Sequence, residues 1–342
     1  MATNRNPAIS LCRVFSMFLI ILCHIIHLYT FIPGSQFLKE VLNVGVYTFL
    51  AISGYLYGQK EVTHFRRWLM QRAEKIMLPA SLLSVCVFAG IAVVHRAFDP
   101  VSFLVYLVNL QGLAFFLPSK WIFFREQTIL APLWFVTVIM LCYCLVPLLQ
   151  KLRSRFPAFR LCLLLSVVIA GGCYVLGFST GIMLFHFLTF SVGYCMGRFG
   201  EEQCIRHWPF AGYTVCTMLL QGVRLWLRIV CDGSGYYQAF VGVSHMALGI
   251  WILGVFFLLG RALPELMGRL SRSRPVKTLD GISLYVYMTH NVFVMSGLSP
   301  YRYTDNLLIS TLLFFLLSFA SAIVLRWFAE QIRRMTTGKQ RT

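Results

Sequence analysis

Charged residues are scarce in this sequence, and acidic residues are the scarcest of them. Only 12 % of the 342 residues are charged, and 12 aspartates and glutamates stand against 30 lysines and arginines. A soluble globular domain usually has about 25 % charged residues, so the composition excludes that class. Hydrophobic residues make up 58 % of the chain, and the mean hydropathy is +0.73. These values are typical of a polytopic membrane protein.

Paired cysteines are also missing. The eleven cysteines are an odd number and lie mostly inside apolar segments, without the C-x-x-C spacing of zinc or redox motifs. This pattern predicts neither a metal site nor a disulfide framework. We therefore expect the cysteines to pack as small apolar side chains and the protein to hold no metal.

Apolar segments of about 20 residues, long enough to cross the roughly 30 Å core of a bilayer, recur along the chain. Ten of them are found, at 9–31, 41–58, 77–95, 131–150, 160–178, 181–198, 208–227, 238–260, 279–298 and 307–326. The segment 101–117 is shorter and contains Asn109 and Gln111, so we expect it to be interfacial or re-entrant. Neither a soluble domain nor an internal repeat is evident. The sequence predicts one integral-membrane domain over residues 1–342, an all-α bundle of about ten transmembrane helices.

Lysine and arginine are distributed unevenly between the predicted loops. With ten spans and a cytoplasmic N-terminus, 22 of the 30 lie in cytoplasmic segments, six lie outside, and Arg13 and Arg224 lie within spans. This split follows the positive-inside rule, so we expect both termini, including the tail 330–342, in the cytoplasm. Topology thereby explains the net charge of +18, and no nucleic-acid partner is needed.

Ionisable side chains inside the spans are candidate functional residues, because each costs about 2.5 to 3.5 kcal/mol on insertion scales. Arg13 lies near the cytoplasmic end of the first span. His24 follows eleven residues later, roughly 16 Å further along the helix and about 20° around it, on the same face. His27 lies one turn beyond His24. The first span therefore presents a cation and two imidazoles along one side.

Other polar groups fall in the outer halves of their spans, namely His186, His245, His290 and Arg224. This placement predicts a polar cavity in the outer leaflet, with Arg13 on its cytoplasmic side. For His27, His186 and His245 taken singly, hydrogen-bonded packing is the more frequent interpretation, whereas His24 is favoured as a functional residue.

The spacing of Arg13, ten residues and His24 resembles the first span of the acyltransferase 3 family of membrane-bound acyltransferases. Four further stretches are similar to family motifs, in the same order: FLAISGYLYG (49–58) to a Ser-Gly-Tyr motif, FRRWLMQRAEKIMLP (65–79) to a basic loop that runs into a proline, LAPLWFVTVIMLCYCLVPLL (130–149) to a Trp-Phe span, and GISLYVYMTH (281–290) to a Ser-Tyr-x-x-Tyr-x-x-His signature. One departure stands out, because residues 135–146 contain no glutamate where many members place one. Any acid role of that glutamate is therefore in doubt here.

The resemblance implies an enzyme that moves an acyl group, usually acetyl, from cytoplasmic acyl-CoA to a hydroxyl of a cell-surface glycan or glycolipid. We accordingly expect an O-acetyltransferase in the inner (cytoplasmic) membrane of a bacterium, with acetyl-CoA as the acyl donor. It implies catalytic roles for His24 and Arg13. His24 either acts as general base on the acceptor hydroxyl or carries the acyl group itself, and the sequence leaves both routes open.

The resemblance also suggests where the two substrates bind. The phosphates of coenzyme A would contact Arg13 and a supporting basic cluster, although cations in that loop also set topology. This cluster comprises Arg66, Arg67, Arg72 and Lys75. The cavity would be lined by Ser53, Tyr55, Tyr287, His290 and His27, but Ser-Gly-Tyr is equally typical of close helix packing. Arg224 and Arg228 would meet lipid headgroups or, as a less favoured alternative, an acidic acceptor sugar.

Several alternatives remain open from the sequence. The donor is acetyl-CoA or succinyl-CoA, and the acceptor is a surface polysaccharide, peptidoglycan or a small molecule. A transporter or flippase for a polar solute or lipid-linked sugar would use the same outer cavity, but its usual internal repeats and broken helices are not seen. A membrane sensor or accessory subunit is a second alternative from another class.

Overall fold

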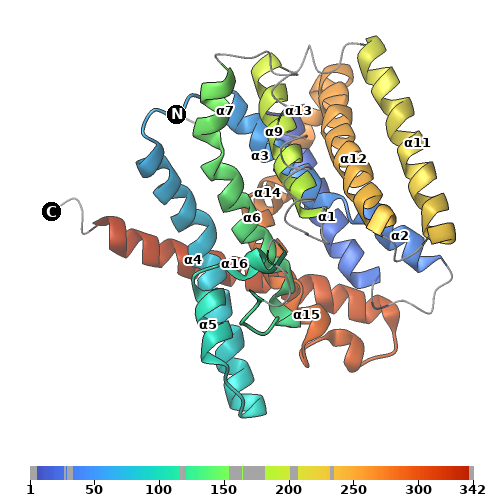
Figure 1. The fold of residues 1–342 in the computed structure, drawn as a ribbon. Coiled ribbons are helices and arrows are strands. Elements are labelled where there is room, and N and C mark those ends of the chain that lie inside the picture. The colour runs from blue at the N-terminus through green and yellow to red at the C-terminus, as the bar shows by residue number, and fades with distance from the viewer. Residues whose placement is uncertain are drawn as a thin grey trace. The chain divides into compact units, whose positions relative to one another are not determined.

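The computed structural model describes residues 6–26, 34–115, 121–153, 182–200, 207–231 and 235–338, with the single residues 28, 117 and 164. Within these ranges every regular element is an α-helix or a 3₁₀-helix, and no strand occurs (Figure 1). Six helical segments are long and apolar enough to cross a membrane: Pro7–Ile26, Ser35–Gly58, Phe65–His95, Thr128–Leu152, Phe240–Ala262 and Leu307–Met335. The prediction of an all-α, multi-pass membrane protein is confirmed.

Six of the ten predicted spans coincide with these segments. The predicted span 160–178 lies outside the described residues except for Leu164. Spans 181–198 and 208–227 correspond to helices α9 (Ile182–Phe199) and α11 (His207–Cys231), which are not among the six segments. The predicted span 279–298 does not correspond to one long helix. Helix α14 (Arg274–Thr289) ends within it, and α15 (Val292–Met295) is a single turn. The count of ten spans and the side of the membrane on which the termini lie stay predictions.

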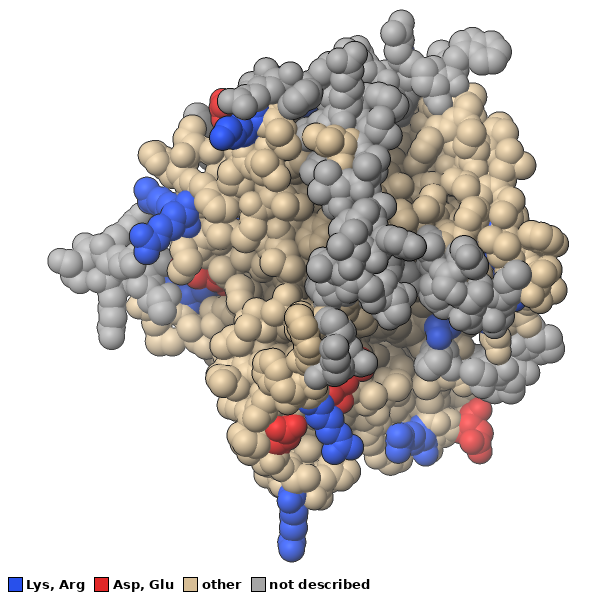
Figure 2. Space-filling model, viewed as in Figure 1, with Lys and Arg blue, Asp and Glu red and all other residues tan. Residues whose placement is uncertain are grey.

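The surface of the described residues suits a lipid environment. Val93 on α4 (Phe65–His95) is 80 % exposed, and large apolar side chains are exposed along α16 (Leu307–Gly338). On the face shown in Figure 2 most of the described surface is neither acidic nor basic, and charged side chains lie as separate groups. Exposed apolar faces of this kind are those that contact lipid in a membrane protein.

The chain divides into two compact units. Unit 1 comprises Met1–Thr63 and Cys144–Asp280, and unit 2 comprises His64–Tyr143 and Gly281–Thr342. Unit 1 contains α1 (Pro7–Ile26), α2 (Ser35–Leu42), α3 (Gly45–Gly58), α7 (Val146–Arg153), α9, α11, α12 (Gly235–Ala262) and α13 (Pro264–Arg272). Its core brings α1, α3, α12 and α13 together around buried apolar side chains such as Cys12, Ala51 and Leu253.

Glycines bring α3 and α9 into very close contact. A Cβ atom on Gly54 would lie 2.0 Å from the carbonyl oxygen of Phe190, and one on Gly197 would lie 2.0 Å from that of Tyr55. Gly58 and Gly193 meet the opposite backbone in the same way. Both helices carry the G-x-x-x-G spacing that allows membrane helices to approach closely. The glycine of the Ser-Gly-Tyr motif, Gly54, is therefore explained by the close packing of α3 against α9.

Unit 2 contains α4, α5 (Pro100–Leu107), η1 (Gln111–Phe115), η3 (Thr128–Leu133), α6 (Trp134–Cys144), the second part of α14, α15, η4 (Pro300–Arg302) and α16. Asp99 caps α5, and the hydroxyl of Ser102, which donates to it at 2.6 Å, lowers the pKa of that carboxyl. Residues 101–117 thus form two short helices and no single span.

The irregular backbone between α5 and η1 is satisfied within the protein. Asn109 has a positive φ of 59°, and its amide donates to the hydroxyl of Ser81 at 2.8 Å. The amide of Gln111 donates to the carbonyl of Leu133 at 2.7 Å. The hydroxyl of Thr137 donates to the carbonyl of Asn109 at 2.6 Å. The polar residues that distinguish this segment in the sequence therefore anchor its turn on the neighbouring helices.

Candidate functional site

Arg13 on α1 is held by an acidic residue that the sequence analysis missed. Its Nη1 lies 2.9 Å from Oδ1 of Asp280, and the two side chains are 25 % and 3 % exposed. The hydroxyl of Ser10, one turn earlier on α1, donates to Oδ2 of Asp280 at 3.3 Å. The only signal for this partner is that Asp280 is the single acidic residue between Glu265 and Asp305.

This ion pair changes how Arg13 can act. Asp280 balances its charge, so the pair is close to neutral overall. A guanidinium has five N–H groups, and the carboxylate uses a minority of them. With a quarter of its side chain accessible, Arg13 therefore remains able to donate to an oxygen of a further ligand, from a fixed position.

His24 lies in the last turn of the same helix and is half-buried. Helix α1 runs from Pro7 to Ile26 without a break, so Arg13 and His24 share one side of it, roughly 16 Å apart along the axis. The neighbouring thiol of Cys23 lies 3.6 Å from the carbonyl oxygen of Lys39 on α2. The His24 end of α1 therefore packs beside α2. His27 lies outside the described residues.

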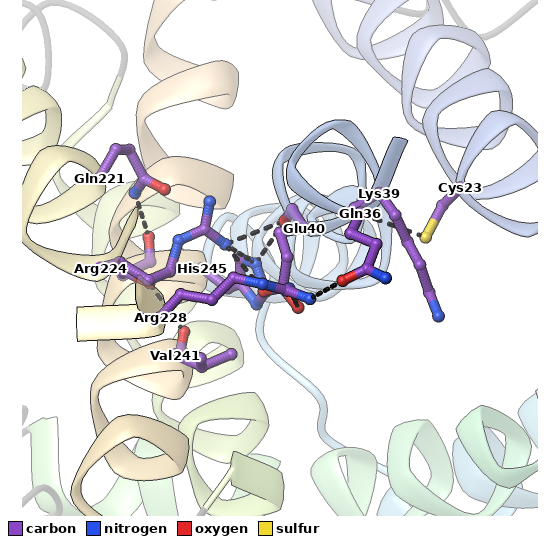
Figure 3. Close-up of polar contacts among 10 residues, drawn as sticks. Cys23, Gln36, Lys39, Glu40, Gln221, Arg224, Arg228, Val241 and His245 are labelled. Atoms are coloured by element: carbon purple, nitrogen blue, oxygen red, sulfur yellow. Dashed lines mark hydrogen bonds and ion pairs between the residues drawn. The ribbon is translucent and has the colours of Figure 1, made fainter. Parts of the chain in front are cut away.

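A polar group that we call the arginine cluster lies where α2 meets α11 and α12 (Figure 3); it consists of Glu40, Arg224, Arg228 and His245. Nη1 of Arg224 donates to the carbonyl of Glu40 at 2.9 Å and lies 3.6 Å from its Oε2. Arg228 contacts Oε1 of Glu40 at 2.5 Å and Oε1 of Gln36 at 2.9 Å. The cluster ties the short helix α2 to α11 and α12.

His245 occupies the centre of this cluster. Its Nε2 lies 2.5 Å from Nη1 of Arg224 and 2.7 Å from the carbonyl oxygen of Glu40. A neutral imidazole nitrogen either accepts or donates, so Nε2 makes one of these two bonds at a time. The favoured prediction that Arg224 meets lipid headgroups is wrong, because its side chain is only 1 % exposed and packs beneath α2.

Two other predicted residues of unit 1, Tyr55 and His186, have packing contacts. The ring of Tyr55 lies 4.8 Å from that of Phe257, and its hydroxyl accepts from the amide of Gln59 at 2.9 Å. Ser53, two residues before Tyr55, is half-buried on α3. His186 on α9 is buried and stacks on Tyr47, with ring centroids 4.3 Å apart. This contact agrees with the packing interpretation of His186.

Two of the predicted cavity residues belong to unit 2. The buried hydroxyl of Tyr287 donates to the carbonyl of Pro132, and its ring lies 5.3 Å from that of Phe135. Nδ1 of the fully buried His290 lies 2.7 Å from the carbonyl oxygen of Tyr287. Asn291 donates to the carbonyl of Thr128 at 2.8 Å. The histidine signature therefore joins α14 to the start of the Trp-Phe span.

The basic cluster predicted for a loop lies on a helix. Helix α4 begins at Phe65, twelve residues before the predicted span, because residues 65–78 contain many good helix formers and no proline or glycine. Arg66, Arg67 and Lys75 are exposed, and Arg72 is half-buried. These residues belong to unit 2, whereas Arg13 and His24 belong to unit 1.

The described residues contain no group of three His, Cys, Asp or Glu side chains arranged to hold a metal ion. Seven cysteines in these residues are free, and four of them, Cys12, Cys23, Cys142 and Cys195, are buried.

Comparison with known proteins gives a family. A family model described as an acyltransferase domain matches residues 6–329. The succinoglycan biosynthesis protein ExoH of Rhizobium meliloti is 30 % identical over 158 residues, which are 42 % of this chain and 41 % of that protein. The chain therefore aligns with less than half of that relative's length, and no solved structure matches. Because the family model covers nearly all of the sequence, from before Arg13 to beyond His290, the chain belongs to the acyltransferase 3 family of membrane acyltransferases.

Proposed function

We propose that this protein transfers an acyl group, most simply acetyl, from cytoplasmic acyl-CoA to a hydroxyl of a cell-surface polysaccharide. In this proposal it spans the cytoplasmic membrane of a bacterium ten times, with both termini in the cytoplasm. The observation that carries the proposal is the arrangement on α1, where Arg13 is fixed by Asp280 and His24 lies three turns further along the same side. The name of the succinoglycan biosynthesis relative supports a polysaccharide as acceptor.

Binding of acyl-CoA needs donors for its phosphates and carbonyl. A guanidinium suits both, because its planar fork of N–H groups matches the spacing of phosphate oxygens. Arg13 has such donors beside the Asp280 contact. In unit 2, Arg66, Arg67 and Lys75 on α4 are exposed cations. We assign phosphate binding to the α4 residues, since Asp280 cancels most of the net charge of Arg13.

The transfer step is an exchange of a thioester for an oxygen ester. In the general-base route, a ring nitrogen of His24 takes the proton of the acceptor hydroxyl while its oxygen attacks the thioester carbonyl carbon. The C–S bond breaks, and the leaving thiolate of coenzyme A takes the proton from the imidazolium. Such a base contributes on the order of 10² to 10⁴ in rate.

The alternative route passes through the histidine itself. The unprotonated ring nitrogen of His24 attacks the thioester carbon, the C–S bond breaks, and the leaving thiolate of coenzyme A takes the proton of the other ring nitrogen. The acceptor oxygen then attacks the acyl-imidazole carbon, the C–N bond breaks, and the proton of the acceptor hydroxyl returns to the ring, which restores the neutral imidazole and forms the ester. The two routes give the same products, but only the second leaves a labelled protein when no acceptor is present.

Transfer is tested with membrane vesicles that receive radiolabelled acetyl-CoA on their cytoplasmic face. Wild-type vesicles are expected to label polysaccharide on the opposite face. His24→Ala should abolish labelling at unchanged protein level, and His95→Ala, at the exposed end of α4, is the matched control. Retained labelling in His24→Ala would remove His24 from the chemistry. Movement of unacylated sugar without labelling would instead support a transporter. Succinyl-CoA in a parallel reaction separates the two donors.

A further inference from the structure

Arg224 is buried, and among the described residues only one of its three guanidinium nitrogens has a hydrogen-bond partner. Its side chain is 1 % exposed, and Nη1 makes the contacts with Glu40 and His245 (Figure 3). Within the described part of the chain, Nε and Nη2 have no hydrogen-bond partner. The N–H groups on Nε and Nη2 of Arg224 are therefore available to a ligand.

The unused groups form one recognition edge. The N–H of Nε and one N–H of Nη2 point in parallel from the same side of the planar guanidinium. This is the fork that binds the two oxygens of a carboxylate or phosphate side by side. A charged donor without a partner is costly in a protein interior, and more so at membrane depth, where water is scarce. Such a residue is a candidate for ligand binding.

The charge of the arginine cluster indicates which anion fits. Arg224 and Arg228 carry two positive charges and Glu40 carries one negative charge, so the cluster has a net charge of +1 with His245 neutral. A carboxylate carries one negative charge and would neutralise the cluster. A phosphate monoester carries about 1.5 to 2 negative charges, which would leave an excess beside Glu40. The balance therefore favours an anion with one negative charge, such as a carboxylate, over a phosphate monoester.

The position of the cluster connects it with the reaction. Glu40 follows Lys39, whose carbonyl lies 3.6 Å from the thiol of Cys23, the residue before His24. Arg228 and Glu40 are 16 % and 23 % exposed, so the cluster reaches the surface on that side. A sugar whose carboxylate is held by Arg224 would then lie near the His24 end of α1.

We propose that Arg224 binds the carboxylate of an acidic sugar in the glycan acceptor, through Nε and Nη2. Glu40 and His245 are positioning residues, because they hold Nη1 so that the opposite edge of the guanidinium is presented. That the bound sugar belongs to the acceptor glycan rests on the proposed function, whereas the binding of a carboxylate by Arg224 does not depend on that function.

Binding is tested on the purified full chain in phosphatidylcholine nanodiscs, with sodium glucuronate, glucose and glycerol 3-phosphate as probes at equal ionic strength. Glucuronate should raise the unfolding temperature in a concentration-dependent way, and glucose should not. Arg224→Lys keeps the charge but loses the two-pronged edge, so it should weaken glucuronate binding about 10- to 100-fold. Arg198→Lys, an exposed arginine on α9, is the matched control and should bind like wild type.

Each outcome decides the proposal. A response to glycerol 3-phosphate without one to glucuronate would overturn the carboxylate and assign the edge to a lipid or other phosphate. Equal responses to glucuronate and glucose, or none, would also overturn it, and this comparison uses the wild-type protein alone, so it holds even if Arg224→Lys does not fold. Acetyl transfer without glucuronate binding contradicts this inference only, and glucuronate binding without transfer contradicts the proposed function only.

Discussion

The guanidinium of Arg13 and the carboxylate of Asp280 form an ion pair of 2.9 Å, although the two residues lie near opposite ends of the sequence. Asp280 is almost fully buried, and a buried carboxylate without a partner is strongly destabilising. In this chain, the position of the Arg13 side chain therefore depends on an acidic residue of another helix, Asp280 on α14. Stability and donor binding are both expected to respond when that acid is changed.

A double-mutant cycle on Arg13→Gln and Asp280→Asn should show coupling of about 1 to 3 kcal/mol in the free energy of unfolding, because each single change leaves a buried polar group without its partner. Denaturant titration in detergent micelles measures it. The matched control is the pair Arg269 and Glu265, which are 76 % and 84 % exposed and should couple by at most about 0.5 kcal/mol. Equal coupling in the two cycles would contradict a structural role for the Arg13 pair.

Close packing between α3 and α9 gives a second prediction. Gly54→Ala places a Cβ atom 2.0 Å from the backbone oxygen of Phe190, so the helices must separate. We expect a loss of about 1 to 3 kcal/mol, as for other overpacked positions. Gly90→Ala on α4 is the control, since no atom lies within 4 Å of its Cβ position, and there the gain in helix propensity is about 0.5 to 1 kcal/mol. Thermal unfolding of both variants should therefore shift in opposite directions.

The sequence predicted those features that depend on local pattern. Long apolar runs identified α1 and α16, and the polar residues of 101–117 indicated a segment that is not one long helix. Pairing between distant elements leaves no such pattern. In the sequence, Asp280 is a single acidic residue near the start of the predicted span 279–298, and nothing marks it as the partner of Arg13. Arg224 is predicted near the membrane interface, and only the structure shows that it is buried beneath α2. The start of α4 was missed because its first turns are charged, although their residues favour a helix.

The histidine signature of unit 2 gives a third prediction. Tyr287→Phe removes the hydroxyl that donates to the carbonyl of Pro132 and leaves that buried acceptor unpaired. The expected loss is about 1 to 3 kcal/mol of unfolding free energy. Tyr303→Phe is the control, because Tyr303 is 75 % exposed and its partner can turn to solvent. If Tyr287→Phe lowers activity at unchanged stability, the hydroxyl acts on a substrate and not on the fold.

The exposed basic face of α4 gives the last prediction. If Arg66 and Arg67 bind the phosphates of acyl-CoA, Arg66→Gln/Arg67→Gln should raise KM for acetyl-CoA about tenfold with little change in kcat, because phosphate contacts are equal in the ground and transition states. The effect should shrink as salt is raised, since exposed charges are screened within about 8 Å at physiological ionic strength. Arg302→Gln, at an exposed arginine after α15, removes one positive charge elsewhere and is the control for a general field effect. Should both arginines serve only to orient the chain in the membrane, the double variant would change the fraction of correctly inserted protein, measured by protease protection. KM of the inserted fraction would then equal that of wild type.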